Sequence, residues 1–389
     1  MKKICHVIFE HRIFDGRIFY KEAVSLATNG FNVVLLAPRI NNKTLGKRKE
    51  ILSEANKDFY YKNIKIESYK YNKILPKIFS LRQHYCIKNI LKKIKEIDAD
   101  IYHFHEDGLT MEVASKLKDY LPEKRLVFDF HEFFLHTYRE KEKKLKFVKH
   151  YIKLENKILN KADIIFTVTE TISNYYKTLC KCPIITLYNC QSKKIFQDED
   201  TINRNDVFWI VHEGRMLFDR GLKLIIEVAR KINNPHIKFL FIGNLPESEK
   251  NYFQERLKQY DIKNKFKVTG FLPYEKVSEW LINTKIGIVF MSSKNSQMGV
   301  PSKFFNYLRF GIPIISLKHP IIDDIIHKHN VGYSFNQDEV DTIVTTIIEL
   351  YSNKTLYKKL SSNARKLFET ELNWDVMEKK LIEAYNSIS

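Results

Sequence analysis

The sequence predicts an α/β protein with two doubly wound domains, each built around a parallel sheet. Short β-branched runs alternate with segments of helical periodicity along the chain, the pattern of repeated strand–helix–strand units. A polar stretch at residues 190–205 interrupts this alternation, which then restarts. Eight of the 12 glycines follow residue 200, and most come just after a predicted strand, where glycine lets the backbone approach a ligand.

The N-terminal cycle begins with a strand at 4–9, a helix at 18–28 that ends at Gly30, and a strand at 32–37 that Pro38 stops. Further strands are predicted where β-branched and aromatic residues cluster, at 101–104, 126–130, 164–168 and 184–188. The C-terminal cycle begins with a strand at 208–212 and a helix at 221–231. Its other strands are predicted at 239–242, 266–268, 286–290 and 312–316.

Composition excludes several classes of protein. With 389 residues, of which 44% are hydrophobic, the chain can bury several large cores, so a disordered chain or a disulfide miniprotein is not expected. No apolar run approaches the roughly 20 residues that a membrane-spanning helix needs. The 5 cysteines are an odd number without CxxC pairs, which favours reduced thiols and a cytoplasmic protein.

The net charge of +19 is unevenly distributed, because residues 1–200 carry 38 basic and 25 acidic side chains. Basic amphipathic segments at 71–97 and 139–161 would suit peripheral contact with an anionic membrane at the inner face of the cytoplasmic membrane. Ordinary solvated surface helices explain these segments about as well. No nucleic-acid partner is expected, because no known binding module is present.

The first chemical motif, residues 212–221, connects a predicted strand to a predicted helix. Gly214 frees the backbone at the strand end, and Arg215 and Arg220 lie in the loop that leads to the helix N-terminus. Guanidinium groups and free backbone N–H groups are what a diphosphate requires. Two solvated arginines are the alternative interpretation.

The second motif, residues 298–316, contains a turn, a helix and a buried strand. The helix is predicted at 303–310, with Ser302 as its N-cap and Gly311 after its last residue. Ser302 and Lys303 at this N-terminus could hold an anion.

Histidines also gather in the N-terminal half. Alternation along a strand places His103 and His105 on one face, and Glu106 and Asp107 follow directly. These residue types can bind metals, but no distant ligand completes a set, so we favour lining of a site and expect no metal.

The two motifs resemble the C-terminal domain of family 4 glycosyltransferases, which are retaining enzymes of GT-B fold. In that fold two Rossmann-like domains face a central cleft. The N-terminal half is similar to a bacterial cell-surface polysaccharide subgroup at residues 11–27, 103–107, 129–132 and 161–170. The last helix resembles the segment that returns to the first domain. The implied domains are 1–195 for the acceptor, 206–370 for the nucleotide-sugar, and the returning helix 371–389.

The resemblance implies a nucleotide-sugar donor, a glycan or lipid-linked glycan acceptor, and no cofactor. Arg215 and Arg220 would bind the donor diphosphate and act in catalysis with His131, which would lie beside the transferred sugar. The other donor-binding positions would be Gly16, Gly214, Gly270, Phe271, Leu272, Gly299, Ser302, Lys303 and Asn306. The acceptor would be contacted by Asp15, Arg17, His105, Glu106 and Asp107.

The chain departs from the family pattern at two positions of one motif. The family has two glutamates eight residues apart, the second of which binds the nucleotide ribose, and here Met298 and Asn306 occupy these positions. An amide lacks charge, so donor binding is expected to weaken by about 1 kcal/mol. A non-catalytic subunit or glycan-binding partner of this fold and a sugar-nucleotide 2-epimerase therefore stay open as alternatives.

Overall fold

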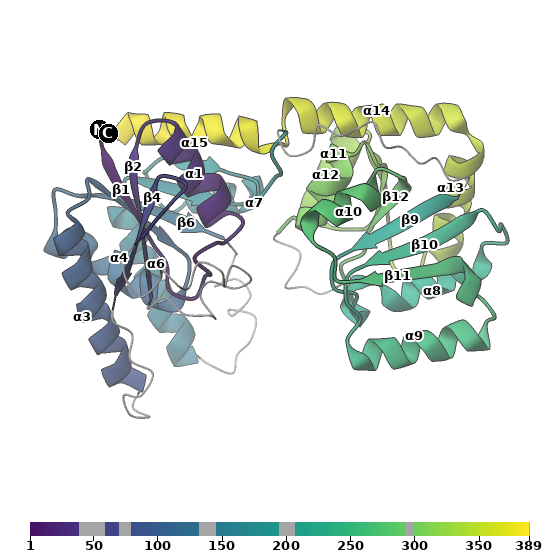
Figure 1. The fold of residues 1–389 in the computed structure, drawn as a ribbon, viewed down its shortest axis with the longest axis horizontal. Helices are drawn as coiled ribbons and strands as arrows, with labels where there is room; N and C mark the ends of the chain where they lie inside the picture. The colour runs from purple at the N-terminus through teal and green to yellow at the C-terminus, as the bar shows by residue number, and fades with distance from the viewer. Residues whose placement is uncertain (39–58, 70–78, 132–144, 194–206, 293–298, 389) are drawn as a thin grey trace. The chain divides into compact units, whose positions relative to one another are not determined.

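The computed structural model describes residues 1–38, 59–69, 79–131, 145–193, 207–292 and 299–388. Contacts divide the chain into two compact units, one formed by Met1–Asn189 with Met377–Ser389 and the other by Cys190–Val376. Each unit holds a largely parallel sheet with helices packed against it, which confirms the predicted class of two doubly wound domains (Figure 1).

The first unit contains an eight-stranded sheet in the order β3-β4-β2-β1-β5-β6-β7-β8. Only the pair β3 and β4 is antiparallel. The strands are β1 Lys3–Val7, β2 Asn32–Pro38, β3 Phe59–Tyr61, β4 Ile64–Tyr69, β5 Ile101–His105, β6 Arg125–Phe130, β7 Ile164–Thr167 and β8 Ile184–Thr186. The helices of this unit are α1 Val24–Thr28, α3 Phe79–Ile97, α4 Gly108–Tyr120, α6 Leu145–Lys161, α7 Glu170–Lys177 and most of α15 Trp374–Ile388.

The segment predicted as one helix at 18–28 is a π-helix at Ile18–Ala23 followed by α1. Asp15 starts it by accepting hydrogen bonds from two backbone N–H groups at 2.8 and 3.0 Å. The wider turn carries Glu22 to within 2.8 Å of the Arg17 guanidinium, and such π segments often occur at functional sites. The predicted helix is therefore present, although apolar periodicity does not distinguish its π-helical first part from an α-helix.

The second unit contains a six-stranded parallel sheet in the order β11-β10-β9-β12-β13-β14. The strands are β9 Phe208–Glu213, β10 Ile237–Ile242, β11 Phe266–Gly270, β12 Thr284–Val289, β13 Ile314–Leu317 and β14 Gly332–Phe335. The helices are α8 Leu222–Lys231, α9 Glu247–Gln259, α10 Tyr274–Leu281, α11 Ser302–Arg309, α12 Pro320–His329, α13 Val340–Ser352 and α14 Lys354–Thr370. The strand order reverses between β9 and β12, and ligands bind at such a switch point in open α/β sheets.

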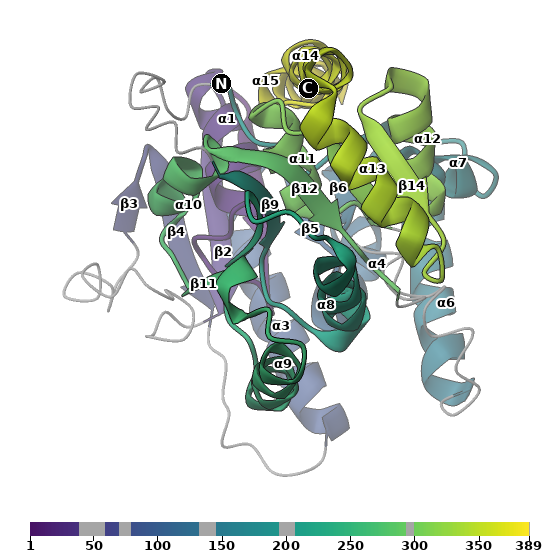
Figure 2. The same ribbon diagram turned by 90° about the vertical axis from the view of Figure 1, so that its right-hand side faces the viewer.

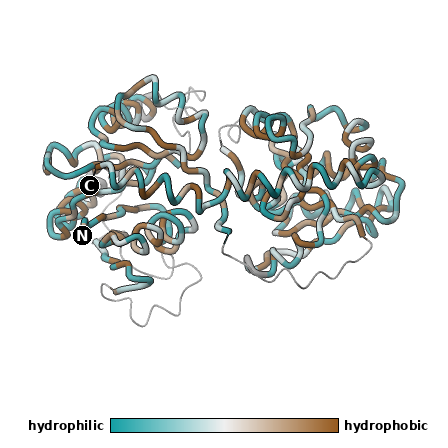
Figure 3. Tube along the Cα trace, turned by 90° about the horizontal axis from the view of Figure 1, so that it is seen from above, coloured by the Kyte–Doolittle hydropathy of each residue, from teal (hydrophilic) through white to brown (hydrophobic). Residues whose placement is uncertain are grey.

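Helices cover both faces of the second sheet. Contacts join α8 to α9 and α13, and separately join α14 to α11 and α12; Figure 2 looks onto this unit, with α8 and α9 below its strands and α11 and α14 above them. The core between these layers is apolar, and Figure 3 shows the hydrophobic stretches of each unit concentrated along its inner elements. This packing fixes the strand ends at which the candidate site lies.

Helix α11 begins one residue earlier than predicted. Pro301 is its N-cap, so Ser302 is the first helical residue and makes no capping hydrogen bond, which corrects the predicted cap. Gly311 follows the helix with a φ of +61°, a left-handed conformation that glycine adopts without strain, as expected. Strands β3, β4 and β14 were not predicted: β3 and β14 have only 3 and 4 residues, and Lys65, Glu67 and Ser68 interrupt the apolar residues of β4.

Within the described residues, no helix is both long enough and apolar enough to cross a membrane. The two basic segments form α3 and α6 where they are described, and residues 71–78 and 139–144 of these segments lie outside the described part.

Candidate functional site

Three glycines stand at the carboxyl ends of neighbouring strands in the second unit. Gly214, Gly243 and Gly270 follow or end β9, β10 and β11, and all three have positive φ angles of 101°, 141° and 69°. A Cβ atom on Gly243 would stand 2.2 Å from the carbonyl oxygen of Gly214, so only glycine allows these two loops to approach. The loops therefore form an open floor of backbone at the edge of the sheet.

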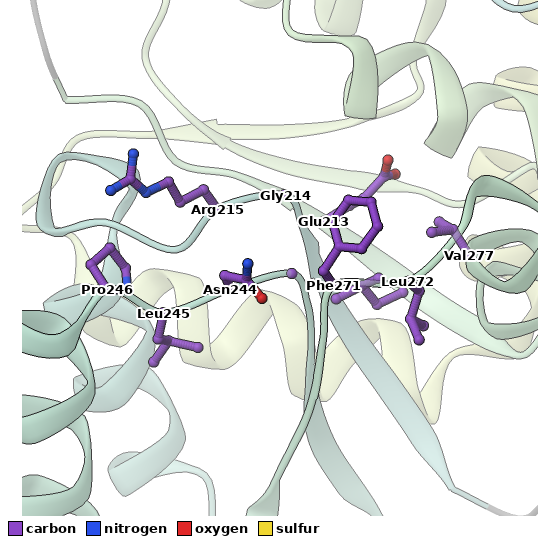
Figure 4. Close-up of a pocket in the computed structure, with 11 residues that line it drawn as sticks. Glu213, Gly214, Arg215, Asn244, Leu245, Pro246, Phe271, Leu272 and Val277 are labelled. Atoms are coloured by element: carbon purple, nitrogen blue, oxygen red, sulfur yellow. The ribbon is translucent and has the colours of Figure 1, made fainter. Parts of the chain in front are cut away.

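A cavity of about 870 Å³ lies over this floor (Figure 4). Apolar side chains from Phe271, Leu272 and Val277 line one part of it, and Arg215 lines another. Phe271 is 59% exposed, which is unusual for an aromatic side chain. The cavity is complete within the second unit; its other lining residues are Glu213, Gly214, Ile242, Gly243, Asn244, Leu245 and Pro246.

Cationic side chains gather beside Gly214. Arg215 and Arg220 are exposed, and Arg220 Nη1 lies 3.8 Å from the position that a Cβ atom on Gly214 would occupy. Lys303, from α11, is only 4% exposed, and its Nζ lies 3.1 Å from Nε2 of His212. Burial, with the nearby Arg220 charge, lowers the pKa of Lys303 to about 7. These three basic side chains together suit an anionic ligand.

Asn306 contacts an acid at the end of β9. Its Nδ2 donates to both carboxylate oxygens of Glu213, at 2.8 and 2.9 Å. Burial raises the pKa of Glu213, although this amide and the Lys303 ammonium act in the opposite direction. Sequence analysis did not select Glu213, which follows the strand predicted at 208–212, because its contact with Asn306 is not visible in the sequence.

The first unit contains a chain of buried imidazoles along β1, β5 and the residue after β6. His6 Nδ1 lies 3.0 Å from His105 Nε2, and His105 Nδ1 lies 3.1 Å from His131 Nε2. Asp129 supports the outer end, with Oδ2 3.0 Å from His131 Nε2. As predicted, His103 and His105 share a face of β5, with ring centroids 4.3 Å apart.

Burial disfavours the charged forms of His6, His103 and His105. Burial lowers the pKa of His6 to about 3 and holds the pKa values of His103 and His105 well below the usual range. His6, Glu22, His103 and His105 place one potential ligand atom each within 4.8 Å of one another, so a metal could be tested there. However, the Arg17 guanidinium already lies 2.8 Å from Glu22 and would repel a cation. We therefore interpret the cluster as a chain of neutral hydrogen-bonding groups.

Several residues that were predicted to contact the acceptor are buried. Arg17 is 4% exposed and donates to both oxygens of Asp129 and to the carbonyl of Leu187. His105 is fully buried, and Asp107 caps α4 by accepting from two backbone N–H groups. The prediction that Arg17, His105 and Asp107 touch an acceptor directly does not fit these positions, because each side chain already has internal partners.

The remaining predicted positions are accessible. Gly16 and Ser302 are exposed, while Asp15, Glu106, His131 and Gly299 are partly exposed. A Cβ atom on Gly16 or Gly299 would meet nothing within 4 Å. Phe271 and Leu272 line the cavity directly after Gly270, and Met298 lies outside the described residues.

The fold defines a protein with two α/β units, and the second unit holds a cavity at the switch point of its parallel sheet. The family model "Glycosyl transferases group 1" matches residues 193–367, and "Glycosyltransferase Family 4" matches residues 16–190. The chain therefore belongs to the family 4 glycosyltransferases, as the sequence resemblance indicated.

Relatives agree with this assignment. A Candida albicans protein described as chitobiosyldiphosphodolichol beta-mannosyltransferase is 24% identical over 281 residues, which cover 65% of this chain and 60% of that protein. The chain thus spans about three fifths of the length of this relative.

Two solved structures share the GT-B fold. Sucrose-phosphate synthase from Thermosynechococcus elongatus aligns with a TM-score of 0.75 and 12% identity, covering 100% of this chain and 99% of that one. HepE of Anabaena, solved in complex with UDP, aligns with a TM-score of 0.74 and 12% identity, covering 100% of both chains.

Proposed function

We propose that this protein transfers a sugar from a nucleotide-sugar to a glycan acceptor with retention of configuration. The observation that carries the proposal is the group of three cations, Arg215, Arg220 and Lys303, beside the open backbone of Gly214. In the described residues, no carboxylate oxygen lies within 4.0 Å of the buried Lys303 ammonium. Burial disfavours the Lys303 ammonium and the nearby Glu213 charge offsets this only in part, so the group is suited to a diphosphate.

In the proposed reaction, the bond between the anomeric carbon and the diphosphate oxygen breaks. A bond from that carbon to an acceptor hydroxyl forms on the same face, and the acceptor proton passes to the leaving diphosphate. Arg215 and Arg220 would stabilise the negative charge of the leaving group, which is the largest contribution the protein can make to such a transfer. His131 would contact the transferred sugar and position it. This arrangement needs no metal.

We propose a growing surface glycan, carried on a lipid, as the acceptor, which would place the protein in polysaccharide biosynthesis. The resemblance of residues 11–27 and 103–107 to the polysaccharide subgroup supports this acceptor. The excess of basic residues in the first 200 supports it too, because a lipid diphosphate and an anionic membrane both attract positive charge. Contact would then be peripheral, at the inner face of the cytoplasmic membrane.

The test is transfer by the purified protein in the presence of EDTA. UDP-glucose, UDP-N-acetylglucosamine and GDP-mannose would each be combined with a short-chain lipid-diphosphate sugar, and products would be identified by mass spectrometry. We expect a glycosylated lipid and a nucleoside diphosphate in equal amounts, and neither with Arg220→Ala. Conversion of the donor without acceptor would indicate an epimerase, and donor binding without turnover a non-catalytic subunit. Failure to bind any nucleoside diphosphate would contradict the proposal altogether.

A further inference from the structure

The carboxylate of Glu213 is the only acid among the 11 residues that line the cavity of the second unit. It lies between the arginine part and the apolar part: Figure 4 shows its side chain between Arg215 on one side and Val277 on the other. A carboxylate so placed would repel a phosphate and accepts hydrogen bonds, so the part of a ligand that suits it is a hydrogen-bond donor such as a hydroxyl group.

The Glu213 carboxylate is also held in place. Asn306 donates its Nδ2–H groups to both oxygens, at 2.8 and 2.9 Å, from the first turns of α11. Asn306 itself is 1% exposed, so its amide is enclosed while the acid reaches the cavity. Each carboxylate oxygen has further lone pairs, so the pair can accept two more hydrogen bonds without losing its support.

A nucleoside diphosphate presents three parts in a row: a flat base, a ribose with two neighbouring hydroxyls, and the phosphates. The cavity offers a group for each part, with Phe271 for the base, Glu213 for the ribose and Arg215 for the phosphates. The two oxygens of one carboxylate can accept from both hydroxyls of a cis-diol, and such charge-assisted hydrogen bonds are strong.

We propose that Glu213 binds the ribose 2′ and 3′ hydroxyls of the donor and that Asn306 is its positioning residue. This inference rests on the proposed function. In the family pattern a carboxylate stands at the position of Asn306. In this protein Glu213, which accepts the hydrogen bonds of Asn306, supplies a carboxylate instead. In this proposal the carboxylate that binds the ribose stands on β9 instead of α11, and donor binding is retained.

The experiment measures calorimetric binding of UDP, 2′-deoxy-UDP and 2′,3′-dideoxy-UDP to the full chain. GDP and ADP with their deoxy analogues serve if UDP binds weakly. We expect the natural protein to bind 2′-deoxy-UDP about tenfold or more weakly than UDP. Glu213→Gln should lose most of this preference while binding dideoxy-UDP nearly as the natural protein does. The exposed Glu255→Gln, on α9, is the matched control and should change neither affinity.

Two further variants test whether Glu213 recognises the ribose or only supports the fold. Glu213→Asn alone should lose the preference for UDP, and combining it with Asn306→Glu should restore the preference. Two results would overturn this inference and leave the proposed function standing. One is a Glu213→Gln protein that keeps the full preference for UDP over 2′-deoxy-UDP. The other is a protein with both Glu213→Asn and Asn306→Glu that binds UDP without this preference. A natural protein that binds no nucleoside diphosphate would overturn both.

Discussion

Asp129 Oδ2 lies 3.0 Å from Nε2 of His131, at the carboxyl end of β6. The same carboxylate accepts from Nε and Nη2 of Arg17 at 2.9 and 3.1 Å, so its position is fixed from two directions. His131 is therefore oriented by a buried acid that is itself held by a buried base. Because Nε2 faces Asp129, Nδ1 is the imidazole nitrogen that remains for a ligand.

This orientation predicts unequal effects of two amide substitutions at His131. Asparagine places a polar atom near the position of Nδ1, whereas glutamine places one near the position of Nε2. We expect His131→Asn to keep more activity than His131→Gln, and His131→Ala to lower kcat by about 10²-fold or more. Steady-state transfer assays measure these values. Affinity for the nucleoside diphosphate should stay within about twofold in all three variants, and equal rates for the two amides would contradict the assigned orientation.

The cationic group predicts the effect of changes at Arg220. Arg220→Ala should weaken binding of the nucleoside diphosphate by more than about tenfold, because one charge-assisted contact to phosphate is lost. Arg220→Lys should recover most of the affinity, since the loop that ends at Gly221 can present either cation. Arg230→Ala, an exposed arginine of α8 that pairs with Glu227, is the control and should have no effect. Unchanged calorimetric affinity in Arg220→Ala would exclude Arg220 from the phosphate site.

Sequence analysis selected several residues that lie at or beside the cavity, and their role in donor binding stays a prediction. Gly214 was selected as a strand-end glycine, Lys303 as a cation at a helix N-terminus, and Gly270 from the family resemblance. Gly243 was missed, although it follows a predicted strand, because the need for glycine arises from its contact with Gly214. Close approach of two loops is a tertiary property, and one sequence does not reveal it.

The contacts of the acidic residues were harder to predict, because they too arise only in the tertiary structure. Glu213 and Asn306 are 93 positions apart and meet only when β9 and α11 pack. Asp129 was part of a matched motif, but its pairing with Arg17 depends on the π-helix that carries Arg17 inward. Buried pairs of this kind also explain why Arg17 and Asp107 were placed at the acceptor: a charged residue is expected at the surface unless its partner is known.

The buried imidazoles predict loss of stability in mild acid. His6, His103 and His105 have lowered pKa values in the folded protein and protonate near pH 6.5 when unfolded. The unfolded chain therefore binds more protons below pH 6.5, so the free energy of unfolding falls as the pH falls, by up to about 1.4 kcal/mol per pH unit for each histidine. The raised pKa values of Glu22 and Asp107 act in the opposite direction and offset part of this loss.

A single substitution isolates the contribution of one imidazole. His6→Leu should reduce the pH dependence of the unfolding free energy between pH 4.5 and 6 by about 1.4 kcal/mol per pH unit. Urea titrations at several pH values measure this slope. The exposed His327→Leu should leave the slope as it is in the natural protein. The same slope in all three proteins would mean that His6 is protonated in the folded state.

The depressed pKa of Lys303 predicts that nucleotide binding takes up a proton. In the free protein its pKa is about 7, because burial and Arg220 disfavour the ammonium. A bound diphosphate raises this pKa, so above pH 7 the lysine must gain a proton on binding, and affinity falls by up to tenfold per pH unit as the pH rises. Below pH 7 the lysine is already charged and this dependence disappears. Calorimetry of UDP binding at pH 8 in buffers of different ionisation enthalpy should show uptake of about 0.9 proton. Lys303→Met should bind UDP more weakly and without that uptake, whereas heats that do not depend on the buffer in the natural protein would show that Lys303 does not contact the charge of the diphosphate.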